Sequence, residues 1–159
     1  MTSSLPQLGR RGEGWVALQV VLLAAIVAAG AKGRRWPSTS RGVRMAAAGL
    51  SGLGGLYLLG DGIARLGRQI TPFPKPVEEG SVKSTGAYGL VRHPMYGGVL
   101  LLTLAWSLAS SPLALMPWTV AVGFLDAKRR REEAWLVEEH PDYEEYRTSV
   151  RHSLVPFVW

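Results

Sequence analysis

The sequence predicts an all-α protein, namely an integral membrane helical bundle with about four transmembrane helices followed by C-terminal interfacial helices. Two observations lead to this fold class. The apolar residues are gathered into four runs instead of being spread along the chain. Basic residues flank those runs, as they do at the ends of membrane spans. The length of 159 residues suits one domain, so residues 1–159 are expected to form a single membrane domain.

The first two apolar runs are predicted to cross the bilayer at residues 14–31 and 43–60. No charged residue occurs between Trp15 and Ala31, and this stretch has the length that a span needs. A cleavable signal peptide is the alternative, although the apolar stretch is long for one and is followed by a weak cleavage site. The second run is rich in glycine, and small residues let membrane helices pack closely.

Residues 71–93 are predicted to form an irregular loop that leads into the candidate site. Three prolines, Pro72, Pro74 and Pro76, interrupt any helix in this segment. Binding residues are often carried by loops of this kind, because a rigid scaffold positions them while their sequence is free to vary.

The third and fourth apolar runs, residues 94–110 and 112–127, are predicted to form a transmembrane hairpin. Its turn at Ser111 carries no charge, which favours the non-cytoplasmic side of the membrane. Because two helices of similar length reach similar depths, the hairpin should return residues 128–133 to the face that holds Arg92 and His93.

Residues 128–159 are predicted to form a cytoplasmic or interfacial helical tail. Lys128 and Glu132 stand four residues apart, so a solvated helix with paired charges is one interpretation. Tyr143 and Tyr146 fall on one helical face, and an interfacial helix requires no catalytic role for them. The last six residues are apolar enough to dock onto the bundle or the membrane.

The composition excludes several kinds of site. The chain has no cysteine, and its three histidines lack the helical spacing of metal ligands, so no metal is expected. The net charge of +6 comes from basic residues beside apolar runs, which favours membrane lipids over nucleic acid as partners. One basic loop, Lys32–Arg44, would lie outside the cell if all four runs cross and the site is cytoplasmic. Either that loop resists the positive-inside tendency, or an early segment does not fully span.

The stretch Arg92–Gly98 is where polar residues meet the third apolar run. Pro94 suits the first turn of a helix, and the free N–H groups that follow make such an end attractive to anions. Each residue also has a simpler interpretation: Arg92 as a membrane flank, His93 as a capping residue, and the glycines as helix-packing positions.

This stretch, the apolar hairpin, the sequence Glu132–Leu136 and the later Tyr143–Tyr146 segment together resemble the isoprenylcysteine carboxyl methyltransferase family. Related phospholipid methyltransferases share the RHPxYxG and EE signature. The resemblance covers about half of the chain, from roughly Glu79 to Trp159. It rests on the order and spacing of motifs, since a single motif of this kind is weak.

The resemblance implies an enzyme that uses S-adenosyl-L-methionine, with residues 71–93 on the cofactor side. A lipophilic, prenyl or lipid-like substrate would enter from the bilayer and be methylated on a carboxyl group. By motif position, the cofactor-binding residues would be Val82, Lys83, Tyr88, His93, Pro94, Met95, Tyr96, Gly97, Glu132 and Glu133. The catalytic residues would be Lys128, Arg129 and Arg92, with either Lys128 or Arg129 facing the substrate carboxylate.

Other functions stay open at this point. The acceptor could be a lipid amine or another small lipophilic molecule. Membrane sterol reductases resemble the C-terminal half and use NADPH, although they are generally longer. A non-enzymatic transport component is a third reading, but no charged residue lies in mid-span to mark an ion path. The protein is expected to be a multi-pass protein of the cytoplasmic membrane of a bacterium, with the site on the cytoplasmic side.

Overall fold

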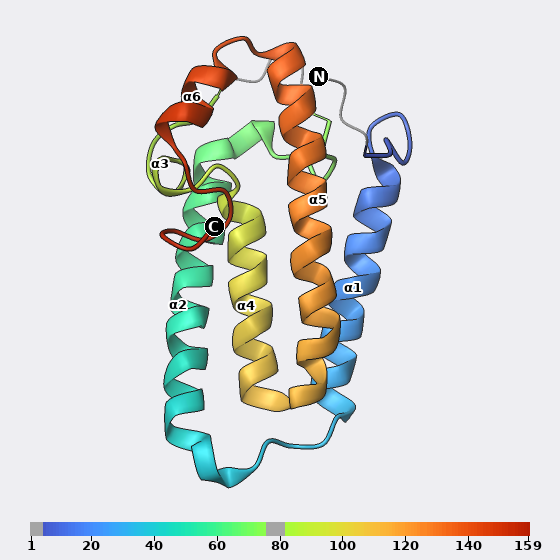
Figure 1. Cartoon of the computed structure of the whole chain (residues 1–159), viewed down its shortest axis with the longest axis vertical. Coiled ribbons are helices and arrows are strands. Elements are labelled where there is room, and N and C mark those ends of the chain that lie inside the picture. Colours follow the sequence, from blue (N-terminus) through green and yellow to red (C-terminus); the bar gives the residue numbers. More distant parts are fainter. Residues whose placement is uncertain (1–4, 76–81) are drawn as a thin grey trace.

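The computed structural model describes residues 5–75 and 82–159, and within them all regular structure is helical. Four long helices run side by side: α1 (Glu13–Lys32), α2 (Arg41–Leu66), α4 (Pro94–Ser110) and α5 (Leu115–Glu139). Figure 1 shows them aligned along the long axis, with the short helices α3 (Ala87–Leu90) and α6 (Tyr143–Ser149) gathered at one end. Three 3-10 turns occur at Ser38–Ser40, Gly67–Gln69 and Pro112–Ala114.

Two helical segments are long and apolar enough to cross a membrane, namely Glu13–Lys32 and Ser38–Gln69. Helix α4 is apolar but shorter. Large apolar side chains are exposed along α1 and α2, including Val20, Val21, Val27, Leu50, Leu53 and Leu56. A soluble monomer rarely exposes so continuous an apolar surface. These features indicate a membrane protein, and four complete spans remain a proposal.

Helices α4 and α5 form the hairpin that positions the site. Pro94 is the first residue of α4, where its missing N–H costs no hydrogen bond. Ser111 ends α4 in an extended conformation, and its hydroxyl accepts a hydrogen bond from Leu113 N. Helix α5 then continues without a break from the apolar run into the charged run. The two helices therefore return the charged run of α5 to the end where α4 begins.

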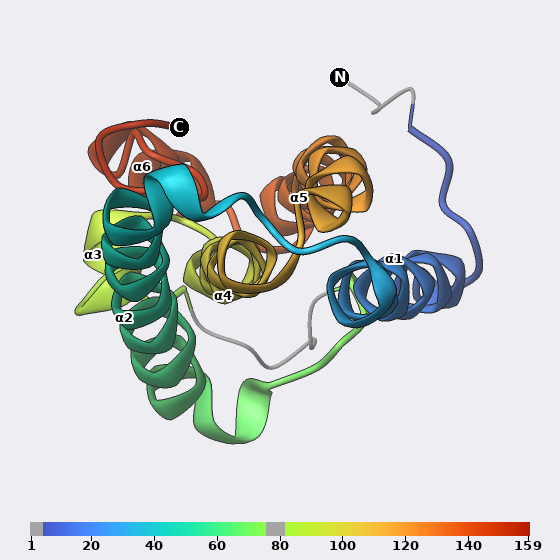
Figure 2. The same ribbon diagram turned by 90° about the horizontal axis from the view of Figure 1, so that it is seen from below.

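A core of apolar side chains joins α1, α4 and α5. Its buried members are Ile26, Leu100, Ala114, Ala121, Leu125 and Leu154. Figure 2 shows α4 between α2 and α5, with α1 beside α5. Leu154 is fully buried and docks the C-terminal segment onto the bundle, whereas Phe157 and Val158 are exposed.

Glycines allow α2 and α4 to approach closely. A Cβ atom at Gly98 would lie 2.8 Å from the Leu59 backbone nitrogen and 2.9 Å from the Gly55 carbonyl oxygen. Close backbone approach through small residues is the usual device for packing helices in lipid. By contrast, a Cβ at Gly49 on α2 would meet nothing within 4 Å.

We expect Gly98→Ala to destabilise the α2–α4 contact by about 1–3 kcal/mol, because the added methyl group overpacks it. The thermal unfolding midpoint of the purified protein in detergent measures this effect. Gly49→Ala is the matched control and should not lower the midpoint, since alanine is the better helix former. Equal midpoints for the two variants would contradict this packing.

Candidate active site at the start of helix α4

The site lies where the first turn of α4, the middle of α5 and the C-terminal segment meet. The backbone N–H groups of Arg92 and His93 donate to the carbonyl oxygens of His152 and Ser153, at 3.0 and 2.8 Å. Gly97 has no side chain here, and a Cβ would fall 1.8 Å from the Leu154 carbonyl oxygen. The glycine is therefore required for the C-terminal segment to cross the start of α4.

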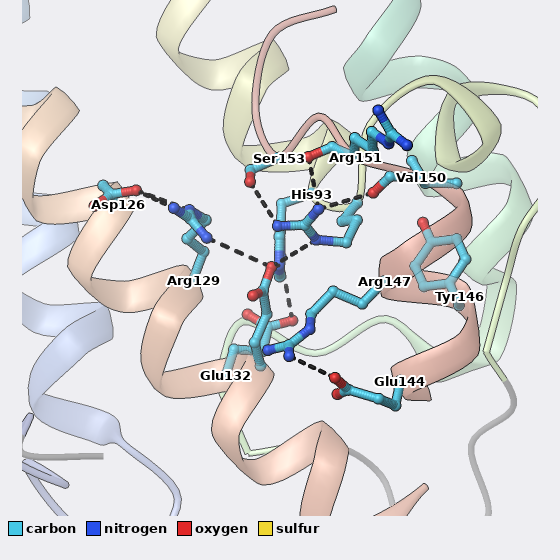
Figure 3. A network of polar contacts seen from close by, with 12 residues as sticks. His93, Asp126, Arg129, Glu132, Glu144, Tyr146, Arg147, Val150, Arg151 and Ser153 are labelled. Carbon is cyan, nitrogen blue, oxygen red and sulfur yellow. Dashed lines mark hydrogen bonds and ion pairs between the residues drawn. The ribbon is translucent and has the colours of Figure 1, made fainter. Parts of the chain in front are cut away.

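A buried ion pair joins Arg92 and Glu133. It belongs to a polar network that also includes His93, Arg129 and Ser153, whose side chains Figure 3 labels. Arg92 Nε lies 2.9 Å from Glu133 Oε1, and His93 Nε2 lies 3.0 Å from the same oxygen. Arg129 approaches this carboxylate to 3.6 Å from the preceding turn of α5 and pairs with Asp126 at 2.6 Å. Glu133 is thus surrounded by three nitrogen-bearing side chains.

Arg92 also fastens the C-terminal segment. Its Nη1 donates to the carbonyl oxygens of Val150 and Arg151, both at 2.8 Å, and its Nη2 donates to Ser153 Oγ at 2.7 Å. Nε, Nη1 and Nη2 of the guanidinium therefore all donate hydrogen bonds to protein groups, and these bonds hold the C-terminal segment against the start of α4. Arg92 borders a cavity, but its donors point to protein acceptors.

The charge of Glu133 is maintained by this network. Burial alone would raise the pKa of its carboxyl, but hydrogen bonds and positive charge from His93 and Arg92 outweigh burial and lower the pKa from 4.5 to about 2. Glu133 is therefore an anion at neutral pH.

Glu132, one residue earlier on α5, faces a different environment. Its Oε2 accepts a hydrogen bond from the Tyr96 hydroxyl at 2.5 Å, and its Oε1 lies 3.9 Å from His93 Nδ1. The rings of His93 and Tyr96 are stacked in parallel, with centroids 5.5 Å apart. Glu132 lines a cavity that Glu133 does not reach.

This first cavity is bordered by α4, α5, α6 and the segment before α3. Its aromatic lining consists of Phe73, Tyr88, Tyr96, Tyr143 and Tyr146. Its ionisable lining groups, besides the tyrosines, are Lys83, Arg92, His93, Glu132 and His140. Val82 and Met95 complete the predicted residues that line it. The hairpin therefore brings most of the predicted cofactor residues to one cavity.

The remaining predicted residues serve the surrounding structure. Pro94 and Gly97 are buried in the first turn of α4, and Glu133 and Arg129 belong to the ion-pair network. Of the predicted cofactor-side loop, residues 71–93, residues 76–81 lie outside the described residues.

Tyr143 has a feature that the sequence did not predict. The side chain is almost fully buried, lines the first cavity, and has a hydroxyl without any hydrogen-bond partner in the described structure. Burial, followed by the charges of Glu133 and Glu132, raises the pKa of this hydroxyl, so it stays a donor. A buried polar atom without a partner is rare in native proteins and calls for a ligand or water. In the sequence, Tyr143 was singled out by the helix face that it shares with Tyr146 and by the motif resemblance, and neither assigned it a role.

A second cavity lies between α1, α2, α4 and α5. Apolar side chains form most of its wall: Val16, Val20, Leu59, Met95 and Val99. Lys128 lines it and is 1% exposed. Its ammonium group donates to Gln19 Oε1 at 2.6 Å and to the Pro72 carbonyl at 3.2 Å, and lies 5.0 Å from the Tyr96 ring centroid. Burial lowers the pKa of Lys128, and the charge of Glu132 opposes this shift.

We expect Glu133→Gln to lower the free energy of unfolding by about 3 kcal/mol, because it leaves the Arg92 guanidinium buried without its anion. Glu144→Gln breaks the exposed pair with Arg147 and should cost less than about 1 kcal/mol. Thermal unfolding in detergent compares the two. Similar losses would show that the buried pair does not hold the site together.

The same carboxyl predicts a pH dependence. Since folding lowers the pKa of Glu133 from 4.5 to about 2, its contribution is complete above pH 4.5 and is lost as the pH falls toward 2. Unfolding midpoints of wild type and Glu133→Gln should therefore converge over that pH interval. A constant difference between pH 6 and pH 2.5 would contradict the assignment.

The comparisons with known proteins relate part of the chain to one enzyme. No protein-family model matches the chain, and no solved structure matches it. A stretch of 79 residues is 32% identical to the Delta(14)-sterol reductase TM7SF2 of Mus musculus. The match covers 47% of this chain and 19% of the reductase, so it spans about a fifth of that protein's length. The chain is thus a partial relative of a sterol reductase, while the likeness to isoprenylcysteine carboxyl methyltransferases rests on the motifs.

Proposed function

We propose that this protein is a membrane enzyme that transfers a methyl group from S-adenosyl-L-methionine to a lipophilic acceptor. The observation that carries the proposal is the chemistry of the first cavity. Among the described residues, its lining combines the carboxylate of Glu132 with four tyrosine rings, one of which has a buried hydroxyl that lacks a partner. The resemblance of the Arg92–Gly98 and Glu132–Leu136 motifs to methyltransferases supports the same assignment.

The lining residues suit a cationic cofactor. S-adenosyl-L-methionine carries a positive sulfonium and an ammonium group, and cations are attracted to aromatic faces and to carboxylates. Glu132 is the acidic group of the described lining, and the rings of Tyr88, Tyr96, Tyr143 and Tyr146 border the same space. The Tyr143 hydroxyl supplies a donor for a carboxylate or hydroxyl oxygen of the cofactor.

A nicotinamide cofactor fits this lining less well. NADPH carries several phosphate charges, and proteins bind phosphate with arginine, lysine or free backbone N–H groups. Arg92 forms an ion pair with Glu133 and donates hydrogen bonds to the C-terminal segment. Lys83 is the other lysine or arginine among the described lining residues, so the described wall offers few groups for several phosphate charges.

The residues of the first cavity have distinct roles in this proposal. When bound, the cofactor supplies an already activated methyl group, so the protein's main contribution is alignment. Glu132 binds the ammonium group or the ribose hydroxyls, and Tyr143 donates a hydrogen bond. Arg92, His93 and Glu133 orient the first turn of α4 and keep the wall rigid.

The second cavity is the proposed site of the acceptor. Its apolar wall suits a prenyl or lipid-like chain, and Lys128 provides a buried cation at one end. The structure separates the two candidate cations: Lys128 lines this cavity, whereas Arg129 turns toward Asp126 and Glu133. We therefore assign Lys128 to an anionic acceptor group such as a carboxylate. A carboxylate nucleophile needs no general base, whereas an amine would need one.

The two cavities share three lining residues, Thr71, Met95 and Tyr96. The Tyr96 ring is contacted by Lys128, and its hydroxyl reaches Glu132 in the first cavity. Cofactor and acceptor would therefore meet beside this ring. Met95 and Tyr96 also offer backbone N–H groups in the first turn of α4, where the helix dipole favours an anion.

The proposal places the protein in a bacterial cytoplasmic membrane with four spans and a cytoplasmic site. The short apolar helix α4 and the apolar first half of α5 would supply the two spans beyond α1 and α2. Lys128, Arg129, Arg130 and Arg131 follow directly after the α5 span. Such a cluster is typical of the cytoplasmic side.

We expect S-adenosylhomocysteine to bind the detergent-purified protein and raise its thermal unfolding midpoint. Glu132→Gln should weaken binding about tenfold or more, because a charged hydrogen bond is lost. Tyr143→Phe should weaken binding by about threefold to tenfold without destabilising the ligand-free protein, since the hydroxyl has no partner there. Isothermal titration calorimetry measures these affinities.

Glu138→Gln is the matched control, because Glu138 is exposed on the same helix. It should bind like wild type. Wild-type affinity in both Glu132→Gln and Tyr143→Phe would remove the cofactor assignment.

We expect Lys128→Met to bind S-adenosylhomocysteine normally but to transfer at least tenfold less labelled methyl group into lipid or prenylthiol extracts. The physical reason is the loss of the buried cation that holds the acceptor. Scintillation counting of extracted lipid, followed by product identification, provides the measurement. Arg130→Met removes an exposed cation from the same helix and should retain activity. Unchanged transfer by Lys128→Met would contradict the acceptor site.

An NADPH-dependent membrane reductase is the second candidate function, favoured by the partial match to a sterol reductase. The same titration separates the two. Binding of NADPH without binding of S-adenosylhomocysteine would overturn methyl transfer and support the reductase.

A further inference from the structure

The end of the bundle opposite the site carries an ordered basic loop. It joins α1 to α2 and passes beneath the turn between α4 and α5 (Figures 1 and 2). Three side chains tie it to that turn. Trp36 Nε1 donates to the Ser107 carbonyl at 2.9 Å, Ser111 Oγ donates to the Arg34 carbonyl at 2.7 Å, and Arg44 Nη1 donates to the Leu108 carbonyl.

These hydrogen bonds hold the loop in place, and four of its five basic side chains remain exposed to solvent. Arg44 lies over the Trp36 ring at 5.4 Å, and both side chains are partly buried against the end of α4. The other four cations, Lys32, Arg34, Arg35 and Arg41, are exposed. Within residues 5–75 and 82–159, none of these four forms an ion pair. No acidic residue occurs between Lys32 and Arg44, so the positive charge is not neutralised locally.

The position of these cations relative to the apolar surface identifies a partner. Lys32 ends α1, and Arg41 begins α2, which are the two helices with exposed apolar side chains. Val27 and Leu50 are 52% and 74% exposed within about two to three turns of this loop. A bilayer would cover that apolar surface and bring its phosphate groups level with the basic loop. A soluble anionic partner would leave the apolar surface exposed.

We propose that this basic loop is a binding surface for the headgroups of anionic phospholipids. The hydrogen bonds made by Trp36, Arg44 and Ser111 hold the loop, and with it the exposed cations, at this end of the bundle. The partly buried Trp36 suits the membrane interface, where tryptophan is enriched. This surface accounts for the strongly basic loop at the end away from the site, which the positive-inside tendency did not explain.

Retention of lipid by the intact protein tests the proposal. The full chain is reconstituted in nanodiscs of equal parts phosphatidylcholine and phosphatidylglycerol, released in the mass spectrometer, and scored for bound lipid. Wild type should retain phosphatidylglycerol in preference to phosphatidylcholine. The combined variant Lys32→Gln, Arg34→Gln, Arg35→Gln and Arg41→Gln should lose this preference, with each cation worth on the order of fivefold in affinity.

The control removes the same charge from the opposite end, at four exposed arginines: Arg10, Arg68, Arg130 and Arg151. This control should keep most of the preference. The proposal is overturned if the loop variant retains phosphatidylglycerol like wild type, if both variants lose it equally, or if wild type shows no preference. Trp36→Leu tests the Trp36 hydrogen bond with all charges present, and it should weaken the preference because the loop loses its attachment to α4.

Discussion

The buried pair of Arg92 and Glu133 is the interaction on which the rest of the site depends. It joins three parts of the chain that are far apart in sequence: the start of α4, the middle of α5 and the C-terminal segment. Either charge alone would be costly at this depth, so the two must be satisfied together. Because Arg92 also binds the carbonyl oxygens of Val150 and Arg151, the end of the chain is drawn over the start of α4. The first cavity lies beside this closure, and the α6 residues Tyr143 and Tyr146 line it together with Glu132.

Tyr96 separates two environments of different polarity. The first cavity is lined by a carboxylate and aromatic rings, while the second is lined by apolar side chains and one buried ammonium group. Both Glu132 and Lys128 contact this tyrosine, the first through its hydroxyl and the second over its ring. Such a partition would allow a polar cofactor and a lipid-like acceptor to meet without sharing a binding surface. It requires helix α1, because Gln19 completes the contacts of Lys128.

Much of the framework could be predicted from local features of the sequence. Apolar runs, Pro94 at a helix start and the uncharged turn at Ser111 were sufficient to predict the α4–α5 hairpin. The hairpin in turn implied that His93 and Glu132 would lie near each other, and His93 Nδ1 lies 3.9 Å from Glu132 Oε1. The sequence could not predict that Glu132 lines the first cavity while Glu133 pairs with Arg92. Adjacent residues on a helix point about 100° apart, and the surrounding segments decide which of the two side chains enters a cavity. The unpaired hydroxyl of Tyr143 was missed for the same reason, since a hydroxyl lacks a partner only in a particular packing.

The sequence by itself determined the helical class, the apolar character of the bundle and the set of polar residues near the start of α4. These properties follow from composition and periodicity, which act over a few neighbouring residues. The tertiary structure decided which cation enters the second cavity, which carboxylate enters the first, and that Arg92 is committed to holding the C-terminal segment. Those outcomes depend on burial and on partners contributed by distant segments, because the free energy of a buried charge is set by everything that surrounds it.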